Sequence, residues 1–208
     1  MQQHRIYSVY MILMMHAATP MNTPCNSNTT ALKYGAGQLN PAKAHDPGLV
    51  YDTVEGDYVA MLCAQGYNAT QLALVTGSNT TACPNGSTSG TPSDLNYPTM
   101  AARVEPGMKF SVVFPPTATN VGAAAAVYDV KVVFPVEAVN DLTVVVSPSR
   151  LEFSAQGQKI LFTVGVSGVA MEEGRVHSGA VVWYNNEHEV RSPVVVYATS
   201  DDSQQNGV

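Results

Sequence analysis

The sequence predicts a mainly β protein in which a seven-stranded antiparallel β-sandwich, residues 94–198, follows a region of short helices and loops, residues 1–93. Two patterns support this division. After Asp94, short runs with an apolar residue at every second position alternate with turn residues, as in half-buried strands. Before Asp94, apolar positions recur every three to four residues, as in helices. Hydrophobic residues make up 45% of the 208 residues, which is enough for a globular core.

The charge and hydropathy patterns argue against nucleic acid and membrane as partners of this protein. Charged residues make up only 12% of the chain, about half the usual share. The formal net charge is -6, and the lysines and arginines are scattered without a run, so we expect no nucleic-acid partner. No uninterrupted apolar stretch reaches about 18 residues, so we expect no membrane span.

The first fifty residues contain an apolar block followed by a loop-like stretch. The block, Ile6–Ala18, has two interpretations. It has the basic start and small closing residues of a signal peptide, or it is a buried helix that stops before Pro20. Residues 22–48 are rich in Gly, Pro and Asn, which predicts a loop.

Two short helices are expected next. Gly56–Tyr67 has helical spacing, with Asp57 as the candidate N-terminal cap and Gly66 as the candidate end. A second helix, opened by Asn68 or Thr70, is expected to run through Val75. Residues 76–93 consist mostly of small and polar residues and predict a surface loop.

The β-rich part contains about seven strands in about a hundred residues. The runs are Leu95–Met100, Met108–Phe114, Val127–Phe134, Leu142–Val146, Leu151–Phe153, Ile160–Val166, and a hairpin of Val181–Trp183 and His188–Tyr197 around Asn185–Asn186. Trp183 is expected in the core between the sheets. This number and spacing are typical of sandwiches of the immunoglobulin or fibronectin type. The polar tail, residues 199–208, is expected to be frayed.

Cysteines and sequons point to an oxidising compartment. The three cysteines, Cys25, Cys63 and Cys83, lack the C-x-x-C spacing of zinc or redox sites. The candidate N-glycosylation sites are Asn28, Asn68, Asn79 and Asn85. Three of them fall within eighteen positions around the last two cysteines, which favours a secreted protein. The alternative is that threonine-rich loops generate sequons by chance.

Several landmarks resemble those of plant subtilisin-like serine proteases, the subtilases. Residues 34–52 resemble the family signature Gly-Ala-Gly, then Asn-Pro, then Asp-Pro-Gly-Leu-Val-Tyr-Asp. Further matches in the family order are Asp57-Tyr58, Leu62-Cys63, Gly66-Tyr67, Cys83, Leu95-Asn96-Tyr97-Pro98, Thr119-Asn120-Val121-Gly122 and Arg191-Ser192-Pro193-Val194. Leu13-Met14 and Ala17 match more loosely, because Met15 and His16 replace two threonines. The resemblance covers about residues 13–197.

The resemblance implies an architecture and a location. Residues 1–93 would be the end of a subtilisin α/β catalytic domain, and residues 94–198 a fibronectin type III-like domain. Cys63 and Cys83 would close a disulfide loop stabilising the fold by roughly 3 kcal/mol, with Cys25 unpaired. The parent enzymes imply an extracellular location, in the apoplast or cell wall.

Two departures from the family pattern stand out. Gln38 replaces a usual histidine. Pro115-Pro116 is expected to end a strand early or bend an edge, because proline cannot donate a ladder hydrogen bond.

The chemistry of a protease is missing from the sequence. A subtilisin-type reaction needs a serine, a histidine, an aspartate and an oxyanion donor. The family carries these upstream of the position of Tyr34, and no Gly-Thr-Ser-Met occurs here. The nearest string, Gly90-Thr91-Pro92-Ser93, has proline at the critical place. We therefore expect no catalytic residue.

Other candidate groups point to no second site. His45 is expected in a loop or at a helix start, and His177 and His188 are expected to face solvent. Glu172-Glu173 is expected to be solvated. His188 lies between two glutamates, but nothing nearby completes a coordination set, so we expect no metal and no cofactor.

Three functions follow as hypotheses. The first is an accessory region that stabilises or shapes a subtilase catalytic domain, in cis or in trans. Residues 22–48 and the apolar block would then lack their packing partners and be poorly ordered or sticky. The second is a fragment of a gene model whose complete product is an active secreted serine endopeptidase. The third is a free-standing secreted binding module that acts by strand addition, with a homodimer as one form.

Overall fold

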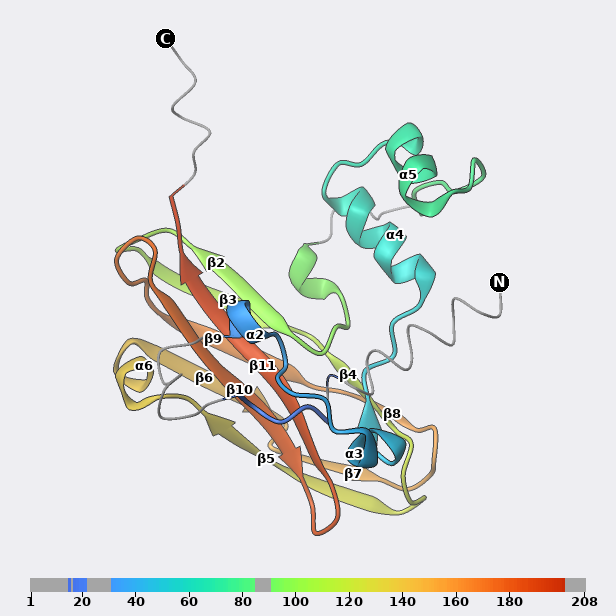
Figure 1. Ribbon diagram of the computed structural model, residues 1–208, viewed down its shortest axis with the longest axis vertical. Coiled ribbons are helices and arrows are strands. Elements are labelled where there is room, and N and C mark those ends of the chain that lie inside the picture. The colour runs from blue at the N-terminus through green and yellow to red at the C-terminus, as the bar shows by residue number, and fades with distance from the viewer. Residues whose placement is uncertain (1–14, 16, 22–30, 85–90, 201–208) are drawn as a thin grey trace.

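The computed structural model describes residues 15, 17–21, 31–84 and 91–200 (Figure 1). The apolar block, apart from Met15, Ala17 and Ala18, lies outside the described residues. The elements are α2 Ala31–Tyr34, α3 Pro41–His45, β1 Leu49–Val50, α4 Glu55–Ala64, α5 Ala69–Thr76, the 3-10 helix η3 Pro92–Asp94, β2 Met100–Val104, β3 Lys109–Phe114, β4 Thr117–Asn120, β5 Ala126–Val133, α6 Val136–Asp141, β6 Leu142–Ser147, β7 Arg150–Phe153, β8 Lys159–Leu161, β9 Thr163–Val169, β10 Val176–Tyr184 and β11 Glu189–Ala198.

The strands form a two-layer sandwich, which confirms the predicted mainly β class. One layer is a five-stranded sheet with the order β2-β11-β10-β5-β7, in which β2 lies parallel to β11 and the other pairs are antiparallel. The second layer consists of the sheets β3-β9-β6 and β1-β4-β8. The described residues therefore form eleven named strands where about seven were expected.

The extra strands arise partly from a break in one ladder. Phe114 pairs with Val164 before the break, and Thr117 pairs with Leu161 after it, so the register is unchanged. Pro115-Pro116 interrupts the pairing because proline has no N–H to donate, and the Phe162 N–H donates to the Pro116 carbonyl at 3.0 Å. The expectation that these prolines end a strand is confirmed. The expected single strand Ile160–Val166 was wrong, since it is divided at Phe162 into β8 and β9.

The core lies between the layers and contains Trp183, as predicted. Its ring stands edge-on to Phe162, with centroids 5.1 Å apart, and both side chains are buried. Val164 and Val166 of β9 belong to the same buried cluster as Val194 and Val196 of β11. Alternating apolar positions therefore meet between the sheets, as the period-two pattern requires.

Some boundaries differ from expectation for local reasons. The strand expected at Leu95–Met100 begins only at Met100. Before it, the Asn96 side chain takes the place of a ladder, because its amide donates to the carbonyls of Asp52 and Thr117 and its oxygen accepts from the Thr117 N–H. The α6 helix, between β5 and β6, was not expected.

One of the two expected helix caps is found, and the other residue has a different role. Asn68 caps α5, accepting from the Gln71 N–H at 3.0 Å, while the Gln71 side chain accepts from the Asn68 N–H at 2.9 Å. Asp57 is not the cap of α4, because the helix begins two residues earlier and its carboxylate accepts from the Val54 N–H.

The loop expected over residues 22–48 was only partly right. Its described part contains α2 and α3. The α3 helix forms where Asn40 caps the chain and Pro41 opens the first turn. Residues 22–30 lie outside the described residues.

Candidate docking site: the N-terminal strap and the outer sheet face

The segment that enters the sandwich from the N-terminal side lies across the five-stranded sheet. We call residues 17–21 and 31–53 the strap. In Figure 1 its blue part, with α2, runs over β10 and β11. Near its end it contains β1. The α2 helix contacts β11. Residues 22–48 were expected to have lost their packing partners, but their described part, residues 31–48, packs against the sandwich.

The end of the strap is part of the second layer. Leu49 pairs with Asn120 and Val50 with Thr119, so β1 extends the sheet at β4. Just after β1, the Asp52 carboxylate accepts from the Thr119 hydroxyl and lies 2.8 Å from Lys159 Nζ. These contacts fix the register of a two-residue strand that would be too short to hold alone.

Tyr51 carries the strap into the core. Its side chain has no exposed surface, and its ring packs edge-on against Phe162 with centroids 5.9 Å apart. The buried Ser192 hydroxyl donates to its phenolic oxygen at 2.9 Å. Burial raises the pKa of Tyr51, so the phenol stays neutral in the core.

The backbone of the strap lies very close to Tyr128 and His188 of the sandwich at Gly48. Gly48 has φ +75°, and a Cβ there would lie 2.5 Å from the Tyr128 hydroxyl and 2.7 Å from His188 Cγ. Its carbonyl accepts from the N–H groups of Val121 and Gly122 at 2.9 and 3.1 Å. Only glycine combines this conformation with this contact distance.

The inner side of the strap covers the outer face of the sheet. Ala180, Val182 and Val195 point away from the core cluster and are nevertheless buried. The strap contributes small buried residues here, including Ala31 and Ala36, and the Ala31 N–H donates to the Ser178 hydroxyl at 3.1 Å. Small side chains let the strap backbone approach the sheet closely.

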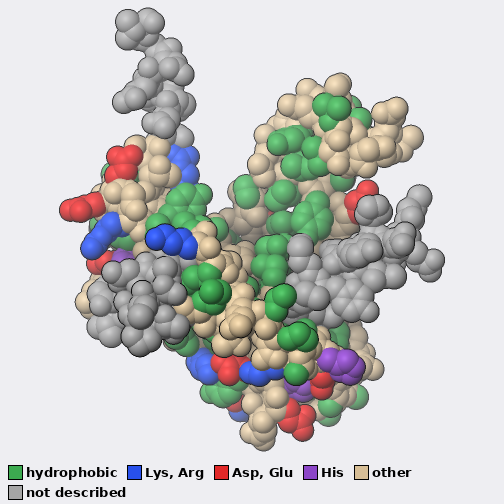
Figure 2. All heavy atoms as spheres, in the orientation of Figure 1, with side chains coloured by type: hydrophobic (Ala, Val, Ile, Leu, Met, Phe, Trp, Pro, Cys, Tyr) green, Lys and Arg blue, Asp and Glu red, His purple; other side chains and the backbone are tan. Residues whose placement is uncertain are grey.

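The strap also has an exposed apolar side. Met21, Leu32 and Leu39 are large hydrophobic residues with exposed fractions of 43%, 57% and 63%. Figure 2 shows hydrophobic side chains scattered over this face of the molecule, including the region between the sandwich and the helices. A further body that covered this side of the strap would remove the apolar surface of these three side chains from water.

A cavity of about 620 Å³ lies between the strap and the sheet. Its charged lining residues are Lys43 of α3, Lys131 of β5, and Glu189 and Arg191 of β11, while Tyr34 and Phe134 supply aromatic surface. Lys131 Nζ lies 3.2 Å from a Glu189 carboxylate oxygen. Burial lowers the pKa of the Arg191 guanidinium, because desolvation disfavours its charged form.

Two histidines lie elsewhere than expected. His177 and His188 were predicted to face solvent, but their side chains are only 11% and 12% exposed. His177 Nε2 lies 2.9 Å from Asp141, and His188 Nε2 lies 3.2 Å from Asp46. Each histidine is held inward by an aspartate from another segment of the chain. Among the described residues, no hydroxyl or thiol is hydrogen-bonded to either ring, so neither pair forms a nucleophilic triad.

The remaining predicted groups are dispersed. His45 is the exposed last residue of α3, and Glu172 and Glu173 are exposed. No group of three or more histidine, cysteine or acidic side chains within the described part of the chain could hold a metal ion.

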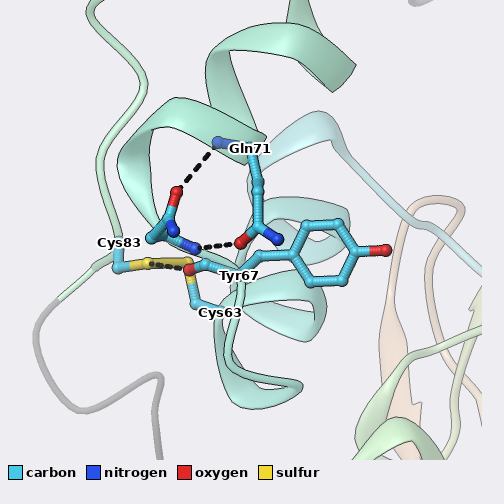
Figure 3. Close-up of a disulfide and its surroundings, with 5 residues drawn as sticks. Cys63, Tyr67, Gln71 and Cys83 are labelled. Atoms are coloured by element: carbon cyan, nitrogen blue, oxygen red, sulfur yellow. Dashed lines mark hydrogen bonds between the residues drawn. A yellow bond between two sulfur atoms is a disulfide. The ribbon is translucent and has the colours of Figure 1, made fainter.

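A disulfide ties together the helical unit, residues 54–84, which projects from the sandwich (Figures 1 and 3). It joins Cys63, on α4, to Cys83, with the Cα atoms 5.7 Å apart. Val59, Cys63 and Leu72 form the small buried cluster of this unit. Cys25 lies outside the described residues.

Two sequon asparagines lie on the surface of the helical unit. Asn68 and Asn79 are both exposed. Asn28 and Asn85 lie outside the described residues. In the described part of the chain, no helix is both long enough and apolar enough to cross a bilayer.

Sequence reasoning missed the strap and Arg191, although one signal was present. Gly179–Trp183 and Pro193–Val196 are continuous apolar runs, with no polar residue at the alternate positions. Such runs are typical of strands buried on both faces. They indicate that a further segment covers the outer face of β10 and β11.

Comparison with known proteins found a matching domain family and similar full-length proteins. Residues 94–196 match the family model of the fibronectin type-III domain. The chain is 40% identical over 184 residues to Subtilisin-like protease SBT4.3 of Arabidopsis thaliana, covering 88% of this chain and 24% of that protein. It is 36% identical over 188 residues to Subtilisin-like protease SBT4.4 of the same plant, covering 89% of this chain and 25% of that protein. The chain thus spans about a quarter of the length of these relatives.

A solved structure shows a weaker likeness. The structure of the Vibrio cholerae VesB protease aligns with a TM-score of 0.34 at 19% identity, over 49% of this chain and 31% of that one. A score this low adds nothing about function.

Proposed function

This chain belongs to the plant subtilisin-like proteases, as their C-terminal part with a fibronectin type-III domain, and on that premise we propose that it is a non-catalytic accessory region that stabilises and orients the catalytic domain. The observation that carries the proposal is the two-sided strap. Its inner side is built into the sandwich, and its outer side exposes Met21, Leu32 and Leu39. A body that covers those side chains would be held in a fixed orientation.

The strap makes the connection rigid rather than flexible. A linker between independent domains is usually exposed and polar, with few contacts to either side. Here β1 is paired in a sheet and Tyr51 is buried in the core. The sandwich cannot swing on such a connection without breaking its own packing. A catalytic domain that buries the strap's outer side would therefore be stabilised by its contact with the folded sandwich.

A chimera tests this role. In it, this chain replaces the matching C-terminal quarter of Subtilisin-like protease SBT4.3. Leu39→Ser is expected to destabilise the chimera by about 1.5–3 kcal/mol, the cost of losing one buried leucine. It should leave the isolated chain nearly unchanged, because Leu39 is 63% exposed there. Thermal unfolding followed by calorimetry measures both.

The matched control is Leu161→Ser, because Leu161 is 61% exposed but lies on β8 in the other layer. It should affect the chimera and the isolated chain equally little. Equal effects of the two substitutions in the chimera would rule out the strap as a docking surface.

The purified chain is expected to show no serine hydrolase chemistry. Neither histidine–aspartate pair has a nucleophile hydrogen-bonded to it among the described residues. A fluorophosphonate probe should therefore label no serine of the folded chain, while subtilisin in the same assay is labelled. Labelling that disappears when the chain is denatured would contradict the proposal.

We propose further that the chain is a secreted glycoprotein with an N-glycan on Asn79, an exposed side chain on the helical unit. A sequon requires Ser or Thr two positions after the asparagine. In chain recovered from a plant secretory pathway, Thr81→Ala should therefore remove the glycan from this site, whereas Thr80→Ala should leave it in place. Glycopeptide mass spectrometry reads the outcome, and an unmodified Asn79 in the unaltered chain would count against the proposal.

A further inference from the structure

Arg191 is a half-buried charge without a carboxylate partner among the described residues. It points from β11 into the cavity under the strap. Its Nη1 donates to the Ala36 carbonyl at 3.3 Å. No carboxylate of the described residues makes an ion pair with it within 4.0 Å. Glu189, two residues before it on β11, attracts the guanidinium, but its carboxylate is paired with Lys131 at 3.2 Å. A half-desolvated guanidinium that has one neutral hydrogen-bond acceptor and a carboxylate shared with a lysine would be stabilised by a carboxylate of its own.

The other carboxylates near this cavity line a different pocket. Asp46 and Glu187 line a small neighbouring pocket and not this cavity. Asp46 is held by His188 at 3.2 Å. Three cations, Lys43, Lys131 and Arg191, therefore face the cavity against the single acid Glu189. This balance is opposite to that of the whole chain, whose formal net charge is -6.

The remaining walls fit a side chain delivered from outside. Phe134 and Val182 provide apolar surface beside the guanidinium, and Ala17–Pro20 of the strap form one border. That border adjoins the exposed side of the strap. A protruding loop of a body covering the strap would meet the cavity directly. A carboxylate is the group that the planar guanidinium fork recognises best, through two parallel hydrogen bonds.

We infer that the Arg191 guanidinium receives an acidic side chain of the catalytic domain, inserted into this cavity when that domain covers the strap. The inference rests on the proposed function, and it adds the chemistry of the contact. Arg191 is then the buried ionic anchor of the interface. The exposed leucines supply its apolar surface.

The test compares Arg191→Gln in the isolated chain and in the SBT4.3 chimera. In the isolated chain the substitution removes a half-desolvated charge that has no carboxylate of the described residues within 4.0 Å, so the unfolding midpoint should stay within about 2 °C or rise. In the chimera it leaves the inserted carboxylate buried without a partner, so the midpoint should fall by about 6 °C or more. Lys109→Gln is the control, an exposed cation on β3 that should change neither midpoint. Arg191→Lys should be intermediate in the chimera, because lysine keeps the charge and loses the fork.

The outcomes separate this inference from the proposed function. If the unaltered chimera fails to fold while the isolated chain folds, the proposed function fails. If the chimera folds and Leu39→Ser destabilises it, but Arg191→Gln behaves like Lys109→Gln, only the ionic anchor is overturned.

A second measurement needs no variant. Phenylglyoxal should modify Arg191 in the isolated chain and be blocked in the chimera, while the exposed Arg175 reacts in both. Equal modification of Arg191 in the two proteins would overturn the inference.

Discussion

Tyr51→Ala is expected to destabilise the entire sandwich by about 3–5 kcal/mol, although Tyr51 precedes the first residue of the fibronectin-type match by more than forty positions. The side chain is fully buried, its ring packs against Phe162, and its hydroxyl accepts from Ser192. Truncation removes the ring from the centre of the core and leaves the Ser192 hydroxyl without its partner. Urea unfolding monitored by Trp183 fluorescence measures the loss.

Two further substitutions make the result specific. Tyr51→Phe keeps the ring and removes only the phenolic oxygen, so it should cost about 1–3 kcal/mol, the penalty for leaving the buried Ser192 hydroxyl unsatisfied. Tyr184→Ala removes a tyrosine that is 39% exposed at the end of β10, and should cost less than about 1 kcal/mol. A Tyr51→Ala protein as stable as the Tyr184→Ala protein would show that the strap is not part of the folding unit.

Gly48→Ala should cost about 2–5 kcal/mol in the free energy of unfolding, because it combines two penalties. A non-glycine residue at φ +75° costs about 1–2 kcal/mol. The added Cβ would also lie within 3 Å of the Tyr128 hydroxyl and His188 Cγ, and relieving such overpacking costs about 1–3 kcal/mol. The carbonyl of Gly48 would be displaced from the N–H groups of Val121 and Gly122, which weakens the attachment of the strap.

Gly174→Ala is the matched control. Gly174 has φ +78°, nearly the same conformation, but a Cβ there would meet no atom within 4 Å. It should therefore show only the backbone penalty. The difference between the two variants in urea unfolding isolates the close approach at Gly48. Equal losses would mean that the strap end can shift to make room.

The contacts of the strap bear on how the chain divides into folding units. Residues 1–93 and 94–198 differ in sequence character, and among the described residues the first region is mostly helical and the second mostly β, with β1 and α6 as the exceptions. The core nevertheless crosses the position at residue 93, because Leu49 and Tyr51 are buried together with Phe162 and Trp183. A sandwich produced without its strap would lack an edge strand and a central aromatic ring.

The sequence by itself determined the features that rest on local periodicity and short-range chemistry. Alternating apolar residues specify which side of each strand faces the core, and Asn68 with Gln71 specifies the start of α5. The landmarks from Tyr34 to Val194 indicated the family. Pro115-Pro116 predicted a break in the strand pairing, because a proline cannot donate a backbone hydrogen bond in any fold.

Only the tertiary structure decided which distant segments share one surface. Period-two patterning shows that a residue is buried but not what covers it, so the outer residues of β10 and β11 did not reveal the strap. The inward positions of His177 and His188 follow from their pairing with Asp141 and Asp46, each of which lies far along the chain. The half-buried state of Arg191 likewise exists only once residues 31–37 lie over β11, because desolvation of a charge depends on neighbours that no local pattern encodes.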